Sequence, residues 1–367
     1  MQLTSVPRLA LRAPALAGHV AGSVAGSMAS SPKSPLDGPF AQLGDEILDR
    51  YVRPNYFKKM EFAEPAGDPG WFGPDSPVWY VHGNFPVMMF GLFSATVMEE
   101  LDPSIAWMGY DHSRIAERVD GVPTGRVDPH GAMVRFAHSL AFFIATAYGP
   151  TATAERAARA VRAMHHTIKG TRPDGLPYDA DDPEWLRWNY ATVVWGIATA
   201  HERYHHRPLR GDDLEAYYRE FTRVGEALGG TDLPASKGEV LEYLEAALPR
   251  LAVTPIVARR AYPNSADESP AGLRPAQWFL YWGTHDMLPS WGRELKFFRR
   301  PDPVTLRQRR AMMWSTLNGL HVAMGPLREY RQAQERVAGG VSFRRRRRAP
   351  RPVADPLMSR DEVEAAI

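Results

Sequence analysis

The sequence predicts an all-α protein: a single multi-helix domain with flexible segments at both ends. Long stretches follow a helical period, clusters of Pro and Gly separate them, and the alternating pattern of strands is scarce. With 367 residues, 44% of them hydrophobic, the chain can form one large domain that encloses a sizeable ligand. We predict a disordered or leader-like segment at 1–38, the helical domain at 39–337 and a basic, disordered tail at 338–367.

The predicted helices follow one another along the domain. The helix at 132–148 ends at Gly149-Pro150, because glycine and proline together stop a helix. The acidic pair Asp212-Asp213 is typical of the start of the helix that follows it. Loops are predicted at the Pro- and Gly-rich stretches, including 121–131 and 170–177. The predicted helical ranges are 86–101, 132–148, 152–169, 185–205, 214–228, 237–248 and 303–337, the last broken near Gly325-Pro326.

Composition excludes several classes of function. The chain has no cysteine, which rules out disulfides, cysteine-ligated zinc, iron–sulfur clusters, cysteine nucleophiles and thiolate-ligated or covalently attached haem. A net charge of +2 gives no general electrostatic basis for binding nucleic acid. No run of about 18 uncharged apolar residues is present, so we expect no transmembrane segment. We expect a soluble cytoplasmic protein, or one attached peripherally to a membrane.

The helix predicted at 152–169 turns one of two adjacent histidines inward. Residues three and four apart share a helix face, so His165 falls on an otherwise apolar stripe with Ala158, Val161 and Ile168. The neighbouring His166 falls on a polar stripe and faces water. An inward histidine is either a core side chain bonded to a carbonyl or, in a protein without cysteine, a candidate axial haem ligand.

The helix predicted at 132–148 is bulky and apolar on most sides, yet it carries polar residues on one of them. Arg135 and Ser139 lie on that side, with His138 one turn from Arg135. An arginine on a largely buried helix needs a partner for its charge. A structural ion pair is one answer. A haem propionate or another anionic edge of a cofactor is the other, since a planar guanidinium suits it.

These two helices carry a resemblance to a known family. The segments Arg135-Phe-Ala-His-Ser139, Tyr148-Gly149 and Met164-His165-His-Thr-Ile168-Lys-Gly170 resemble the centre of the catalytic domain of rubber oxygenase (latex clearing protein) and MpaB-type oxygenases. The resemblance covers roughly residues 75–300, and it rests on the order and spacing of the motifs. Further matches are Gly91, Leu101-Asp-Pro103, Asp174-Gly175, Tyr178-Asp-Ala180-Asp-Asp-Pro183, Trp185-Leu-Arg-Trp188, Glu202-Arg-Tyr204 and Leu288-Pro289 with Arg293.

The resemblance implies an all-α domain around a non-covalent haem b, with His165 as the axial ligand of the iron. It implies that Arg135 and Ser139 line the haem pocket, where Ser139 replaces the family's threonine and keeps only its hydroxyl. Rubber oxygenases have a distal lysine where this chain has His138, which is a distal acid or base, a sixth ligand or a structural residue. The implied partners are dioxygen or a peroxide, an apolar, unsaturated and possibly isoprenoid-type substrate, and an electron donor.

A competing motif lies in the helix predicted at 185–205. His201-Glu202-Arg-Tyr-His205 matches H-E-x-x-H, which in zinc proteases supplies two metal ligands and a general base. The motif stands at a helix end followed by polar residues, which favours a solvated helix terminus instead. Three functions therefore remain open: a haem-dependent oxygenase, a haem-binding or sensing protein without turnover, and a zinc hydrolase using His201 and His205.

Overall fold

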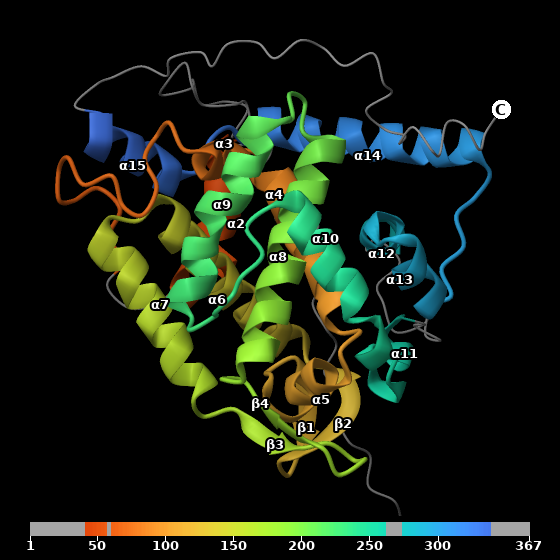
Figure 1. Ribbon diagram of the computed structural model, residues 1–367. Coiled ribbons are helices and arrows are strands. Elements are labelled where there is room, and N and C mark those ends of the chain that lie inside the picture. Colours follow the sequence, from red (N-terminus) through yellow and green to blue (C-terminus); the bar gives the residue numbers. More distant parts are fainter. Residues whose placement is uncertain (1–40, 57–59, 262–273, 339–367) are drawn as a thin grey trace, which may run out of the picture.

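The computed structural model describes residues 41–56, 60–261 and 274–338, and these residues are mainly helical (Figure 1). The all-α prediction is confirmed. The α-helices are α2 (Ala41–Tyr51), α3 (Pro77–Gly83), α4 (Phe85–Glu99), α5 (Pro103–His112), α6 (Pro129–Tyr148), α7 (Thr151–His165), α8 (Pro183–Tyr204), α9 (Asp212–Ala227), α10 (Lys237–Ala246), α11 (Pro255–Ala261), α12 (Arg274–Met287), α13 (Ser290–Leu295), α14 (Pro303–Met324) and α15 (Arg328–Ala338). Two short 3-10 helices are η1 (Arg53–Asn55) and η2 (Leu248–Arg250).

Helices α4 and α8 form the centre of the molecule, and the other helices are arranged around them (Figure 1). In this view α6 and α7 lie to the left of α8, α12 and α13 lie to the right, and α14 crosses the top. The segment Phe85–Met98 contains no charged residue, which suits a helix enclosed by others. Gly91 and Gly196 allow α4 and α8 to meet backbone to backbone, because a Cβ on Gly91 would lie 2.6 Å from the Cα of Ile197.

Four of the helices begin with the same Asp-Pro dipeptide. Helices α5, α6, α8 and α14 start at proline, and the aspartate before each accepts hydrogen bonds from backbone N–H groups of the first turn. Proline fits the first position because its missing N–H would have no helical partner there. The aspartates are Asp102, Asp128, Asp182 and Asp302. The start of α6 matters for function, because this helix carries Arg135 and Ser139 of the site described below.

Two antiparallel hairpins replace two of the predicted loops. Strands β1 (Ala116–Val119) and β2 (Val122–Val127) pair within the loop predicted at 121–131 and just before it. They are joined by Asp120-Gly121, both with positive φ, as a tight two-residue hairpin turn requires. Strands β3 (Lys169–Thr171) and β4 (Pro177–Asp179) pair across the loop predicted at 170–177. Both loop predictions were wrong for these residues, since the Asp-Gly and Gly signals also mark hairpin turns.

The predicted breaks between helices are largely confirmed. Helix α6 ends at Tyr148, immediately before Gly149-Pro150, and the last predicted helix divides into α14 and α15 on either side of Gly325. The segment predicted as leader-like or disordered, 1–38, and the tail from residue 339 onward lie outside the described residues.

Candidate active site

Helices α6 and α7 bring the two predicted cofactor-binding residues to the same level. The helices pack against each other and are joined by the short Gly149-Pro150 turn, so they run antiparallel. Arg135 lies 14 residues before Gly149, and His165 lies 15 residues after Pro150. At 1.5 Å per residue both positions are about 21 Å from the turn, on neighbouring helices. The positive charge of Arg135 accordingly contributes to lowering the pKa of His165.

His165 is buried, and its Nδ1 has no hydrogen-bond partner in the part of the chain that the structure describes. Only 7% of the residue is exposed, and its ring meets the Trp185 ring edge-on at a centroid distance of 5.3 Å. Burial first, and then the charge of Arg135, lowers the pKa of His165 to about 4. The ring is therefore neutral near pH 7, which is the form that binds metal ions.

His166 is exposed, as the helical period predicted, although the predicted end of the helix at residue 169 was wrong: α7 ends at His165, and Lys169 begins β3. The Nδ1 of His166 pairs with a carboxylate oxygen of Asp181 on the loop after β4. The two adjacent histidines thus face in different directions, with His165 inward and His166 outward.

Arg135 and Ser139 form one polar unit on α6. The Arg135 guanidinium donates to Ser139 Oγ at 2.5 Å, and Ser139 Oγ donates to the Arg135 carbonyl at 3.2 Å. Arg135 is accessible to solvent, yet the surrounding protein desolvates it enough to lower its pKa. We infer from this combination that Arg135 lies on the wall of a recess.

Helix α4 supplies the opposite wall of this recess. Although α4 is central, one of its faces is only partly covered by other side chains: Thr96 is exposed, while Leu92, Phe93 and Glu99 are partly exposed. The Phe93 ring stacks on the Phe136 ring of α6, with centroids 5.6 Å apart and planes 4° from parallel. The wall is therefore apolar along most of its length and ends in a carboxyl group.

Glu99 is the site residue that the sequence did not predict. Its Oε1 accepts hydrogen bonds from Asn189 Nδ2 at 2.6 Å and from Thr192 Oγ1 at 3.4 Å, both on α8. Burial raises the pKa of Glu99 to about 7, and the positive charge of Arg135 opposes part of that rise. Near neutral pH this carboxyl group can therefore both hold and release a proton. A signal was available in the sequence, because Glu99 follows fourteen uncharged residues of an apolar helix.

His138 is partly buried beside two positive charges. Its pKa is lowered first by burial and then by the charges of Arg114 and Arg135. A histidine in this environment is neutral near pH 7, so it can accept a proton or a hydrogen bond. The structure brings His138 close to Arg135, as its position one turn along α6 predicts.

The H-E-x-x-H segment does not form a zinc site of the protease type. His201 Nε2 accepts a hydrogen bond from the Leu209 backbone N–H at 2.8 Å, and His205 Nδ1 accepts one from the Arg207 N–H at 3.0 Å. Glu202 is paired with Lys237 and Arg210. No group of three His, Asp or Glu side chains within the described parts of the chain is arranged to hold a metal ion. The prediction of a solvated terminus was also wrong for the two histidines, which are buried against Tyr80.

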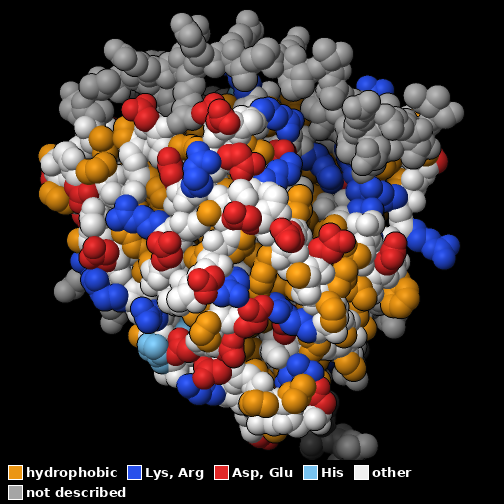
Figure 2. Space-filling view, in the orientation of Figure 1, with side chains coloured by type: hydrophobic (Ala, Val, Ile, Leu, Met, Phe, Trp, Pro, Cys, Tyr) orange, Lys and Arg blue, Asp and Glu red, His pale blue; other side chains and the backbone are white. Residues whose placement is uncertain are grey.

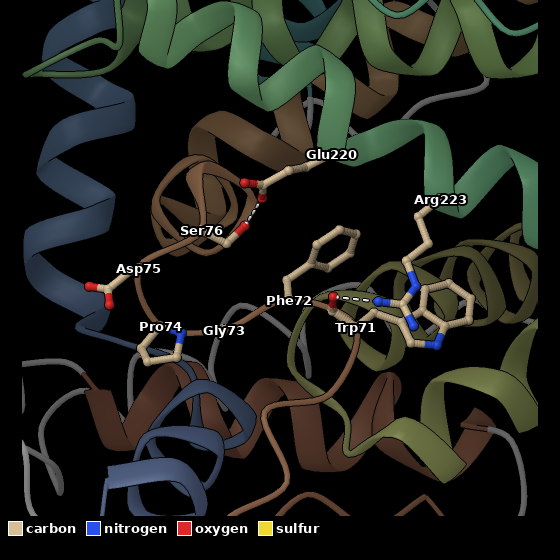
Figure 3. Close-up of a pocket in the computed structure, with 8 residues that line it drawn as sticks. All are labelled: Trp71, Phe72, Gly73, Pro74, Asp75, Ser76, Glu220 and Arg223. Atoms are coloured by element: carbon tan, nitrogen blue, oxygen red, sulfur yellow. Dashed lines mark hydrogen bonds between the residues drawn. The ribbon is translucent and has the colours of Figure 1, made fainter.

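A separate cleft of about 450 Å³ lies on the surface between the 71–76 loop and α9 (Figure 3). Three of its polar side chains are engaged within the cleft: Ser76 donates to Glu220, and Arg223 donates to the Trp71 carbonyl at 2.8 Å while lying over the Trp71 ring. None of the predicted site residues borders this cleft, so the recess between α4, α6 and α7 is the candidate active site.

Comparison with known families identifies the domain that contains this recess. The family model described as ER-bound oxygenase mpaB/B'/rubber oxygenase, catalytic domain, matches residues 79–318. The chain belongs to this family. The match covers about two thirds of the chain and includes Glu99, Arg135 and His165, so the recess lies in the catalytic domain of an oxygenase family. No curated protein and no solved structure matches the sequence significantly.

The match assigns an oxygenase type of oxidoreductase activity to the domain, as the sequence predicted. None of the described helices is long and apolar enough by itself to cross a membrane. Helices α3 and α4 meet the length and composition requirement only as a pair, and the chain bends by 93° between them.

Proposed function

We propose that the protein is a haem b-dependent oxygenase in which His165 is the axial ligand of the iron. The observation that carries the proposal is a buried, neutral imidazole whose Nδ1 has no hydrogen-bond partner among the described residues, beside the recess that we infer between α4 and α6. A buried polar nitrogen without a partner costs free energy, which a bond to a metal would offset. A single histidine is sufficient for haem, since the porphyrin supplies the other four ligands.

The residues around the recess match the remaining needs of a haem. Arg135 offers a guanidinium to a propionate, and Ser139 holds that guanidinium in place through the 2.5 Å hydrogen bond. Phe93, Phe136 and Leu92 offer an apolar wall to a porphyrin or to an apolar substrate. When bound, haem b supplies the activation of dioxygen or of a peroxide.

The proposed substrate is an apolar, unsaturated small molecule, such as an isoprenoid, and an electron donor completes the reaction where one is needed. The apolar wall of the recess supports an apolar substrate, and the family match supports oxygenase chemistry. Glu99 can hold or release a proton at its carboxyl group near pH 7, and His138 can accept one at its ring. The protein thereby supplies binding, orientation and proton transfer.

An absorption spectrum of the purified protein tests the proposal. We expect a Soret band that is lost in His165→Gly and restored when free imidazole is added to that variant. His201→Ala is the matched control, because His201 is also buried, has an unpartnered Nδ1 and has its pKa lowered to about 3. A Soret band that survives in His165→Gly, or purified protein with zinc and no iron, would contradict the proposal.

Oxygen uptake then distinguishes an oxygenase from a haem-binding protein without turnover. We expect uptake that depends on an unsaturated apolar substrate and falls in Glu99→Gln while the Soret band remains. A protein that binds haem through His165 but consumes no oxygen with any substrate of this class would be a haem-binding or sensing protein.

A further inference from the structure

Exposed apolar side chains are concentrated in the part of the chain that forms α12, α13 and α14. Thirteen large apolar side chains are exposed within the described ranges, and seven of them lie between residues 278 and 322. Phe297 is 79% exposed, and Val304 is 66% exposed. Scattered apolar residues are normal on a soluble domain, but a concentration of them marks a surface that contacts something else. Five of the seven lie on α12, between α13 and α14, or on the first half of α14, and we call this region the α12–α14 face: Trp278, Leu280, Phe297, Val304 and Met312.

The elements that carry this face are held side by side. The Arg309 guanidinium of α14 lies over the Trp278 and Trp282 rings of α12, at 5.2 and 5.3 Å from their centroids. Deeper in the molecule, Asp286 of α12 and Arg310 of α14 form a fully buried ion pair at 2.6 Å. Figure 1 shows α12, α13 and the start of α14 together at the right of the molecule. In Figure 2 hydrophobic side chains gather on the right-hand part of the same view.

Phe297 is presented outward by the local backbone. The residue directly follows Lys296 at the end of α13. Its φ is +53°, a value that residues other than glycine rarely adopt. The buried Lys296 on one side forms an ion pair with Glu100, and Phe298 on the other side packs against Trp282 and His285. The backbone is thus anchored on both sides of an exposed phenyl ring.

The α12–α14 face has a basic border. Its segments expose Arg274, Arg299 and Arg307, and Arg309 adds a fourth positive charge beside the tryptophans. Only two acidic residues, Glu294 and Asp302, are exposed on the same segments. Tryptophan and phenylalanine beside arginine are the side chains that favour the interface of an anionic bilayer, where rings enter the headgroup region and guanidinium groups meet phosphates.

The two terminal segments of the chain are poor candidates for covering the α12–α14 face, because of their charge. Residues 1–40 contain Arg8, Arg12 and Lys33 against Asp37, and residues 339–367 contain seven arginines against four acidic residues. Both segments therefore carry the same sign of charge as the border of the face.

We propose that the α12–α14 face docks the protein on the surface of an anionic lipid bilayer. The proposal is independent of the haem, because it rests on the outer side of α12 and α14 rather than on the recess. Partial insertion of Phe297 and Val304 removes apolar surface from water, while the arginines of the border attract the anionic headgroups. Docking would also place an oxygenase next to the phase in which apolar molecules dissolve.

Vesicle flotation with the full-length protein tests the proposal. The two vesicle preparations are phosphatidylcholine alone and phosphatidylcholine with about 30% phosphatidylserine, a fraction that gives a strongly negative surface. We expect binding to the second preparation, weakened by salt, and little binding to the first. The double variant Phe297→Asp/Val304→Asp should reduce binding by about tenfold or more, since two apolar anchors are lost and two negative charges are added.

Two further variants make the result specific to this face. Val119→Asp/Val122→Asp changes two equally exposed valines at the tip of the β1–β2 hairpin, 60% and 67% exposed, and should bind as the wild type does. Replacing Arg344 to Arg348 by glutamine in the full chain tests the basic tail. The proposal is overturned if the wild type does not bind, if the two aspartate pairs have equal effects, or if the tail variant alone abolishes binding.

Light scattering without vesicles tests whether the α12–α14 face instead binds a second copy of the chain. We expect the wild type and Phe297→Asp/Val304→Asp to have the same mass in solution. A wild-type dimer that this variant converts to a monomer would assign the face to self-association and overturn the lipid proposal.

Discussion

The two sides of helix α4 differ in how they are covered, and the difference separates stability from function. On one side Gly91 meets α8 so closely that its missing side chain is the reason the contact is possible. On the other side Leu92, Phe93, Thr96 and Glu99 remain partly or fully accessible, although the helix lies at the centre of the molecule. The closed side fixes the position of α4, and the open side faces Arg135 and Phe136 of α6.

The difference between the two sides suggests why the last residue of the apolar helix α4 is a glutamate. Glu99 lies where the open side of α4 meets the start of the loop to α5, and Asn189 and Thr192 of α8 hold its Oε1. A residue from the closed α4–α8 contact thus positions a titratable group in the open recess. Substitutions on the two sides should therefore have very different consequences.

The largest effect is expected from Gly91→Val on the closed side. A Cβ at this position would lie 2.6 Å from Ile197 Cα and 2.8 Å from the Gly196 carbonyl oxygen, and neither backbone atom can move aside cheaply. We expect the free energy of unfolding in urea to fall by about 3 kcal/mol or more, as for other overpacked cores.

Two controls sharpen this result. Gly109→Ala places a Cβ where no atom lies within 4 Å, and it should be neutral or slightly stabilising in the helix α5. Thr96→Val on the open side of α4 should change the free energy of unfolding by less than about 0.5 kcal/mol. If Thr96→Val were as costly as Gly91→Val, the open side would be part of the core.

A smaller, pH-dependent effect is expected from Glu99→Gln. In the folded protein Glu99 keeps its proton up to a pKa of about 7, whereas the ordinary pKa in the unfolded chain is 4.5. Unfolding between these pH values releases a proton, so this group makes the free energy of unfolding fall as pH rises. Glutamine cannot lose a proton, and the variant should therefore gain roughly 1–2 kcal/mol over the wild type at pH 8.

The measurement is urea unfolding of both proteins at pH 5 and at pH 8. Contributions from other titrating groups cancel in the difference between the variant and the wild type. A difference that is the same at both pH values would show that the Glu99 carboxyl group is ionised in the fold throughout this range.

The sequence was sufficient to predict what depends on neighbours along one helix. The helical period placed His165 inward and His166 outward, and Gly149-Pro150 located the turn that brings Arg135 level with His165. These predictions depend only on residues three or four apart or on strong chain breakers. The same reasoning missed both hairpins, because Asp120-Gly121 marks a turn without saying which short segments pair across it.

The recess itself could not be predicted, because it is formed by helices that are far apart in the sequence. Glu99 on α4 and Asn189 on α8 are separated by 90 residues, and no period relates them. Burial of His201 and His205 was missed for the same reason, since Tyr80 comes from α3. Gly91 was recognised only through the family resemblance, and the α4–α8 contact gives the physical reason for a glycine there.

The smallest effect is expected from Arg135→Gln. This variant tests whether the Arg135 guanidinium acts on the pKa of both His165 and Glu99. The positive charge of Arg135 lowers the pKa of His165 and also that of Glu99. Its removal should raise both pKa values by a few tenths of a unit up to about one unit. His165 should still titrate below its ordinary value of 6.5, since burial is the larger cause of its shift.

NMR pH titration of the cofactor-free protein measures both groups at once. Arg159→Gln is the control, because Arg159 is 68% exposed on the outer face of α7 and pairs with Glu155. A change in the pKa of His165 without a change in that of Glu99 would mean that Arg135 faces only α7. The open side of α4 would then be electrostatically separate from the histidine, and the recess could not hold one cofactor between them.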